Sequence, residues 1–299
     1  MLYGTSHAYA HAYVAEPREL DAITTARLRA TYARLYARER AALIVVGDTT
    51  KETVVPLLEK SFGGWKAAGV AARVDVPPPP AAPASRIALV DLPGASQALV
   101  LLAEPAIPTA SPDRYAFRVM NAILGGFWMS RLNANLREEK GYSYWVNSGI
   151  GARRAAGPFR AGGAMQAEKT GAAVGELLAE LRAMRDRDVT AQELAGAKTF
   201  MTNFLRGSFE RVEWTADSLA TLVTFDLSDR EWQTQAAAID ALTVADIRRV
   251  ATTYLHPETI RLLVVGDRAA VEPQLAALGM GPVEMRDVYG RAIRRDAAK

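Results

Sequence analysis

The residues best suited to chemistry lie at positions 124–146, which read LGGFWMSRLNANLREEKGYSYWV. Arg137 lies one turn before Gly141, which is predicted to end a helix, and Tyr144 enters the strand predicted to follow. A corner of helix, glycine and strand can bring an arginine and a tyrosine to the same side of a sheet. A guanidinium and a phenol can both donate hydrogen bonds to a peptide carbonyl as it gains negative charge.

A purely structural interpretation of this pair is also open. Arg137 belongs to the charged run LREEK, and runs of charge usually form a solvated surface. Tyr144 could simply pack beside Tyr142. On spacing alone the structural interpretation is the favoured one.

Three histidines are the other candidates, and none of them predicts a metal site. His7 and His11 are four residues apart, a spacing that puts both on one face of a helix. No carboxylate lies between them and zinc needs a third ligand, so we expect no metal here. His256 precedes Pro257 in a predicted turn and is assigned no role. The sequence also contains no G-x-S-x-G, G-x-x-x-x-G-K-[ST] or G-x-G-x-x-G motif.

An internal repeat indicates the elements that must position these residues. Positions 20–48 align without a gap with positions 239–267, and both copies close on Val-Val-Gly-Asp. A repeat this long predicts two copies of one larger folded unit. The second copy follows a long stretch of sequence after a run of prolines, whereas only nineteen residues precede the first. We therefore expect the first unit to lack most of its front.

Apolar periodicity, caps and turn residues predict the order of elements. Helices are expected over 20–36, 51–62, 111–124, 129–140 and 174–184, with a further one opened by a capping box at Thr190 and Glu193. Strands are expected over 41–46, 86–92, 97–102, 142–150 and 159–165. This order predicts an α+β fold in which two homologous units each have a mostly antiparallel sheet covered by helices on one face, the first unit being truncated at its front.

The domain organisation follows from the repeat and from four consecutive prolines, which can continue neither a helix nor a central strand. We expect a partial first unit over 1–66 and an Ala/Pro-rich linker over 67–85. A complete second unit over 86–281 and a basic tail over 282–299 follow.

Composition narrows the class of protein. Hydrophobic residues make up 49% and charged residues 23% of the 299 positions, as in globular proteins. No apolar run reaches the ~18–20 residues that a membrane helix needs, and no signal peptide is apparent. Basic residues alternate with acidic ones, so no nucleic-acid partner is expected. The absence of cysteine excludes disulfides and thiolate sites, and the compartment stays open between cytoplasm and periplasm.

At positions 124–146 the chain resembles the insulinase/pitrilysin family of zinc metallopeptidases, which includes the mitochondrial processing peptidases. Three segments resemble the signature of that family's second half: Ser130-Arg131-Leu132, Leu136-Arg137-Glu138-Glu139-Lys140-Gly141 and Tyr144. Segments resembling the back of the first half are His7-Ala8-Tyr9, Ala22-Ile23-Thr24 and Phe62-Gly63-Gly64-Trp65. The resemblance covers nearly the whole chain up to about Gly281, in the family's order.

The resemblance implies a division of roles between two homologous α+β halves. In the family the first half binds zinc through H-x-x-E-H and a distal glutamate, and this sequence contains no H-x-x-E-H. By resemblance, Tyr144 stabilises the tetrahedral intermediate and Arg137 positions the substrate. The loop that carries Gly125, Gly126 and Ser130 corresponds to a substrate-contacting region. Zinc is thus expected in the complete enzyme, and this chain alone is expected to bind no metal and to be inactive.

The resemblance also implies the partners. Substrates are expected to be extended peptides that add as a strand to a sheet edge. The alternative is a zinc-less scaffold or regulatory subunit that pairs with a separate subunit bearing H-x-x-E-H, or that has a purely structural role. A truncated first unit would expose apolar surface, so we expect a homodimer or a heterodimer with a zinc-bearing subunit.

Overall fold

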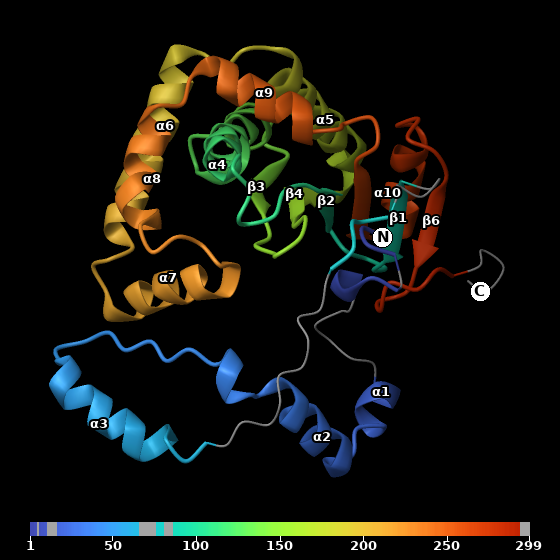
Figure 1. The fold of residues 1–299 in the computed structure, drawn as a ribbon. Helices are drawn as coiled ribbons and strands as arrows, with labels where there is room; N and C mark the ends of the chain where they lie inside the picture. Colours follow the sequence, from blue (N-terminus) through green and yellow to red (C-terminus); the bar gives the residue numbers. More distant parts are fainter. Residues whose placement is uncertain (5, 11–16, 66–75, 81–85, 294–299) are drawn as a thin grey trace. The chain divides into compact units, whose positions relative to one another are not determined.

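The computed structural model describes residues 1–4, 6–10, 17–65, 76–80 and 86–293 (Figure 1). The chain divides into two compact units. Unit 1 comprises Met1–His11, Val76–Asn203 and Trp232–Lys299, and unit 2 comprises Ala12–Asp75 and Phe204–Glu231. The predicted domains follow the repeat and the prolines, whereas these units follow spatial contacts, so the predicted boundaries stay a prediction.

A six-stranded mixed sheet forms the centre of unit 1, in the order β3-β4-β2-β5-β1-β6. β1 pairs parallel with β5 and β6, while β2 with β4, β2 with β5 and β3 with β4 are antiparallel. The strands are β1 (Ile87–Asp91), β2 (Gln97–Pro105), β3 (Ser143–Ile150), β4 (Pro158–Gln166), β5 (Arg261–Gly266) and β6 (Val283–Arg286). The expected α+β class and mostly antiparallel sheet are confirmed.

Helices cover one face of this sheet, where α4 packs against α9 and α5 packs against both α9 and α10 (Figure 1). The helical elements are η1 (Ala8–Ala10), α4 (Arg114–Asn121), η3 (Ala122–Gly126), η4 (Asn133–Glu139), η5 (Ala167–Lys169), α5 (Thr170–Asp186), α6 (Ala191–Gly207), α8 (Glu231–Asp240), α9 (Val244–Tyr254) and α10 (Arg268–Ala276). Within the described residues, no helix combines the length and apolar character that crossing a bilayer requires.

The core of unit 1 lies between the sheet and these helices. In β2 the alternating residues Ala98, Val100 and Leu102 are fully buried, whereas Leu99 is 46% exposed. A strand has a period of two, so one face of the sheet packs on the helices and the other is open. Phe117 of α4 packs edge to face against Phe159 of β4, with ring centroids 6.0 Å apart. Burial of each such side chain stabilises the fold by about 1.5–3 kcal/mol.

Unit 2 contains α1 (Pro17–Asp21), α2 (Thr25–Leu35), η2 (Arg38–Arg40), α3 (Lys51–Phe62) and α7 (Val212–Phe225). The predicted helix over 51–62 is confirmed residue for residue. α2 has no buried residue, and α7 has none either. The extended residues Leu43 and Val45 line a groove together with Leu219 and Leu222 of α7. Unit 2 therefore has little core of its own.

The repeat forms the same helix twice. α2 and α9 occupy matching positions in the two copies, and each begins after a threonine N-cap. Thr24 Oγ1 accepts a hydrogen bond from the backbone N–H of Arg27, and Thr243 Oγ1 accepts one from that of Asp246. Both helices therefore begin with the same capping hydrogen bond, which stabilises each helix by about 1 kcal/mol.

The prediction of a strand over 41–46 is wrong. These residues are extended but belong to no sheet, whereas their counterparts form β5, the strand between β2 and β1. A strand needs neighbours that satisfy its backbone N–H and C=O groups, and no described residue pairs with 41–46 in a sheet. Leu43 and Val45 consequently stay 54% and 47% exposed.

Candidate functional site

The candidate site is the corner between η4 and β3. The predicted helix over 129–140 is largely a π-helix in the structure, with the backbone N–H of Lys140 donating to the carbonyl of Asn135. Gly141 ends it with φ = 64°, as predicted for a glycine at this position. The N–H of Tyr142 then donates to the carbonyl of Leu136 at 2.9 Å. π-Helical turns are rare and often occur at functional sites.

Arg137 and Tyr144 lie side by side at this corner, as predicted. The Cζ atom of Arg137 is 5.2 Å from the centroid of the Tyr144 ring, a cation–π contact. Tyr144 is 83% exposed, whereas Tyr142 packs on the core. Tyr144 is therefore not a packing residue, as the structural interpretation would have it.

A β-bulge turns Tyr144 outward. The register of β3 against β4 shifts between Ser143 and Trp145. The Ser143 hydroxyl oxygen accepts a hydrogen bond from the N–H of Trp145 at 3.1 Å and lies 2.7 Å from the carbonyl oxygen of Ala164. Bulges re-aim a side chain and are common beside active sites. The result is an exposed phenol and an exposed guanidinium that can both donate to one acceptor.

Gly125 and Ser130, predicted to bind substrate, are buried. A Cβ atom on Gly125 would lie 2.6 Å from the backbone nitrogen of Ser148, so this glycine lets η3 approach β3 closely. Ser130 is 2% exposed and accepts a hydrogen bond from the side-chain amide of Asn133 at 3.1 Å. Gly126 is exposed. The substrate-binding role of all three stays a prediction, and burial argues against direct contact by Gly125 and Ser130.

An ion pair anchors the helix that leads into the corner. Arg131 donates two hydrogen bonds to the carboxylate of Glu193, at 2.6 and 3.0 Å. Glu193 also closes the predicted capping box with Thr190, which is confirmed. Hydrogen bonds from Arg131, aided by the N–H of Thr190, lower the pKa of Glu193 to about 2. This carboxylate therefore stabilises the fold only while it is ionised.

The pH dependence of stability should report this pair. Because the folded-state pKa of Glu193 is below its ordinary value of 4.5, its contribution is complete above about pH 4.5 and disappears as the pH falls toward 2. Glu193→Gln should lower the free energy of unfolding by about 1–3 kcal/mol at pH 7, and by much less at pH 3. Urea titrations at pH 7, 5 and 3 measure the difference. The exposed Glu168→Gln is the control, and a pH-independent loss in Glu193→Gln would contradict the assignment.

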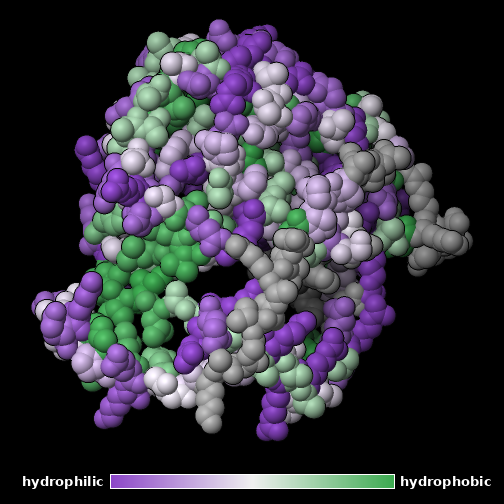
Figure 2. All heavy atoms as spheres, in the orientation of Figure 1, coloured by the Kyte–Doolittle hydropathy of each residue, from purple (hydrophilic) through white to green (hydrophobic). Residues whose placement is uncertain are grey.

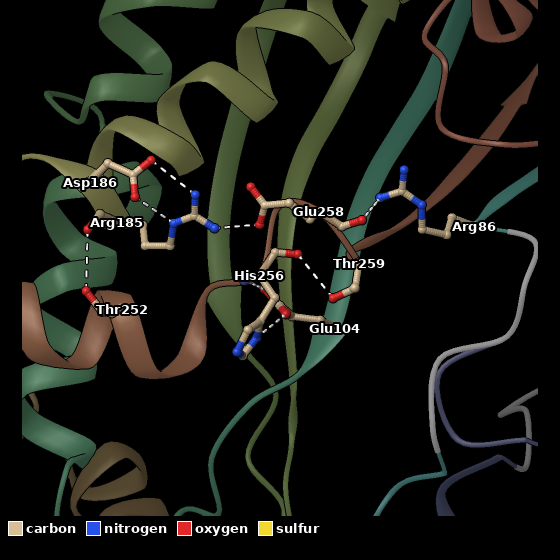
Figure 3. A network of polar contacts seen from close by, with 8 residues as sticks. All are labelled: Arg86, Glu104, Arg185, Asp186, Thr252, His256, Glu258 and Thr259. Atoms are coloured by element: carbon tan, nitrogen blue, oxygen red, sulfur yellow. Dashed lines mark hydrogen bonds and ion pairs between the residues drawn. The ribbon is translucent and has the colours of Figure 1, made fainter.

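A second polar cluster was not expected from the sequence (Figure 3). Glu104 is buried in β2 and accepts a hydrogen bond from the N–H of His256 at 3.1 Å, with the Nδ1 atom of His256 at 3.0 Å from its other oxygen. Burial raises the pKa of Glu104, and the hydrogen bonds from His256 oppose this. Nearby, Arg185 of α5 binds Glu258. These contacts hold the turn before β5 against β2 and α5. The only sign of this cluster in the sequence is the single glutamate in the apolar run QALVLLAEP.

His7 has a structural role. Its Nδ1 atom accepts a hydrogen bond from the N–H of Tyr9 at 3.0 Å, and its Nε2 atom lies 2.9 Å from the carbonyl oxygen of Pro77. The ring also stacks on Tyr3, with centroids 5.0 Å apart. His11 lies outside the described residues. Across the part of the chain that is described, no three His, Asp or Glu residues gather in a metal-binding group.

Comparison with known proteins gives a family match and several fold matches. Residues 22–201 match the sequence profile described as Peptidase M16 inactive domain. A peptidase M16 inactive domain from Pseudomonas fluorescens is 24% identical, with a TM-score of 0.80, and covers 90% of this chain and 64% of its own. A search of curated proteins gave no match.

Two further solved structures share the fold at lower identity. A chain of complex III2 from Candida albicans is 14% identical, with a TM-score of 0.75, and covers 89% of this chain and 64% of its own. A candidate zinc protease from Bordetella pertussis Tohama I is 19% identical, with a TM-score of 0.50, and covers 58% of this chain and 95% of its own. The chain thus spans less than two thirds of the length of the Pseudomonas and Candida proteins.

Proposed function

The chain belongs to the family of the peptidase M16 inactive domain, and from this premise we propose that it forms the substrate-side portion of a zinc metallopeptidase. In this proposal the complete enzyme hydrolyses peptide bonds in extended or unfolded peptides. The exposed Arg137–Tyr144 pair is the observation that carries the proposal. It agrees with the resemblance of the segments around both residues to the second half of such enzymes.

Each member of the pair has a distinct role in the proposal. The phenol of Tyr144 donates a hydrogen bond to the carbonyl oxygen of the scissile bond as this oxygen becomes an oxyanion. The guanidinium of Arg137 lies against the Tyr144 ring and holds the neighbouring backbone of the substrate. Both groups are exposed, so a substrate can reach them without a rearrangement of the core.

The metal is assigned to another part of the complete enzyme. When bound there, zinc polarises the carbonyl group and activates water. His7 does not fit that task, because both of its ring nitrogens are in contact with Tyr9 and Pro77, and the described residues contain no cluster of three His, Asp or Glu side chains. The zinc ligands in this proposal come from a separate segment or subunit that bears H-x-x-E-H.

Exposed apolar surface supports a partner chain or a second copy. Hydrophobic side chains gather over α7 (Figure 2), where Val212, Trp214 and Val223 are each about half exposed. Leu28 and Tyr32 of α2 are also more than half exposed, although their counterparts in α9, Ile247 and Ala251, are fully buried. Surfaces of this kind mark protein–protein contacts. We infer that α2 is completed by a partner in the way that unit 1 completes α9.

Complementation tests the proposed function. The purified chain should bind no stoichiometric zinc and cleave no peptide, whereas mixing it with a subunit that bears H-x-x-E-H should give zinc-dependent cleavage of an unfolded peptide. Metal analysis and a fluorogenic casein assay measure the two properties. Tight zinc binding by this chain alone, which His7→Ala and His11→Ala would have to abolish, contradicts the proposal.

A scaffold role is the second candidate, and the match to the profile described as Peptidase M16 inactive domain agrees with it. In that role the chain would assemble with a zinc-bearing subunit, or have a purely structural place, without touching the substrate. The two candidates differ in one result: a scaffold tolerates replacement of Arg137 and Tyr144 without loss of turnover.

A further inference from the structure

The open face of the sheet in unit 1 carries a hollow that the Arg137–Tyr144 pair does not use. It has a volume of about 340 Å³ and extends over β2, β3 and β4. Gly149 of β3 forms part of its floor, because a Cβ atom there would meet nothing within 4 Å, and Gly162 and Gly163 of β4 also line it. Its walls are formed by Leu99, Leu101, Trp145, Asn147, Ile150 and Arg160.

The strand register gives this hollow two different ends. At one end Trp145 is paired with Ala164, which is paired in turn with Leu99, so this end is aromatic and apolar. At the other end Gly149 is paired with Arg160. Trp145 is 57% exposed and Arg160 is also exposed, so both side chains are accessible from outside.

The size and charge of the hollow favour one kind of ligand. An apolar cavity of about 150 Å³ already holds a benzene ring, so this larger hollow has room for an aromatic side chain. Arg160 is the charged residue in its lining, which includes no carboxylate. A guanidinium recognises a carboxylate through paired hydrogen bonds. In an extended peptide, side chains on one face recur every second residue, about 6.6 Å apart.

We propose that this hollow binds an extended peptide in which an aromatic side chain lies over Gly162 against Trp145, and an acidic side chain two residues away pairs with Arg160. The choice of an extended peptide rests on the proposed function. The new element is the substrate class: unfolded segments with aromatic and acidic residues in alternate positions.

Direct binding to the full chain tests this subsite without any catalysis. The probes are two fluorescein-labelled peptides, Ala-Phe-Ala-Glu-Ala and Ala-Phe-Ala-Lys-Ala, followed by fluorescence anisotropy. The glutamate peptide should bind at least about fivefold more tightly than the lysine peptide, the scale of one accessible ion pair. Arg160→Glu should reverse this preference, and the exposed Arg182→Glu should leave it unchanged.

A second variant fills the hollow. A Cβ atom on Gly149 meets nothing within 4 Å, so Gly149→Phe can place its ring in the hollow without disturbing the backbone. Binding of the glutamate peptide should fall about tenfold or more. Gly196→Phe, at an exposed position with equally open space, is the matched control. Circular dichroism verifies that both variants are folded.

Three results would overturn the subsite: equal affinity for the two peptides, wild-type affinity in Gly149→Phe, or no binding of either peptide. The proposed function is tested separately by turnover of the assembled enzyme in Arg137 and Tyr144 variants. If that turnover falls while Arg160→Glu leaves peptide preference unchanged, the proposed function stands and the subsite is wrong. If peptide preference reverses while turnover is unaffected, the subsite stands as a binding site of a scaffold.

Discussion

Replacement of Tyr144 by phenylalanine should lower the turnover of the assembled peptidase by about 10²–10³, the scale of losing one oxyanion donor. Arg137→Ala should cause a loss of similar size, since it removes the guanidinium that lies 5.2 Å from the Tyr144 ring. Tyr144→Phe keeps the ring and its cation–π contact and removes only the hydroxyl group. The loss should therefore appear in kcat for Tyr144→Phe, and in both kcat and KM for Arg137→Ala.

Steady-state kinetics on the complex with a zinc-bearing subunit measure these losses. Tyr289→Phe and Arg182→Ala are the controls, because they make the same chemical changes at exposed positions away from the corner. Unchanged turnover in both Arg137 and Tyr144 variants would return the pair to a surface role and favour the scaffold. Loss of assembly, checked by size-exclusion chromatography, would show that the pair contacts the partner subunit and would also contradict a catalytic role.

Gly125→Ala should destabilise the fold by about 3 kcal/mol. The new methyl group would lie 2.6 Å from both the backbone nitrogen and the hydroxyl oxygen of Ser148, and 2.7 Å from Leu132 Cδ1. Overpacking of this kind typically costs 1–3 kcal/mol and more where backbone must move. Urea unfolding of the isolated chain measures the loss.

The same substitution at Gly175 should have the opposite effect on the stability of the fold. Gly175 lies in the middle of α5, and its Cβ would meet nothing within 4 Å. Alanine there should stabilise the fold by about 0.5–1 kcal/mol, because glycine is the poorer helix former. If Gly125→Ala were as stable as the wild type but impaired peptide cleavage, its predicted role in substrate binding would replace the packing role.

Local signals in the sequence predicted most of the helices correctly. Thr190 with Glu193 caps a helix as predicted, because a cap depends only on residues within one turn. The helix predicted over 20–36 is divided in the structure, since α1 ends at Asp21 and α2 begins after the N-cap Thr24. Short segments rich in apolar, β-branched and aromatic residues predicted four strands of the sheet. The same signal predicted a strand over 41–46 that does not form, because pairing depends on neighbours far away in the chain. The short strand β6 was placed in a tail, although Val283 and Met285 alternate with charged residues.

The position of the candidate site could likewise be predicted from local sequence, but its detailed geometry could not. Gly141 fixes the corner between Arg137 and Tyr144, so their proximity follows from local geometry. Three features depend on tertiary packing and had no sequence signal: the π-helical turns, the bulge at Ser143, and the burial of Gly125 against β3. The hollow over Gly149 belongs with these, because its walls come from three strands.

The two parallel neighbours of β1, which are β5 and β6, affect how the protein folds during synthesis. Ile87 is paired with Leu262 and Val283, so the first strand of the sheet finds both its partners in the last part of the chain. A ribosome releases β1 long before either partner exists, and an apolar segment without partners is prone to aggregate. Such distant contacts also slow folding. During translation, β1 therefore stays unpaired until β5 and β6 have both emerged.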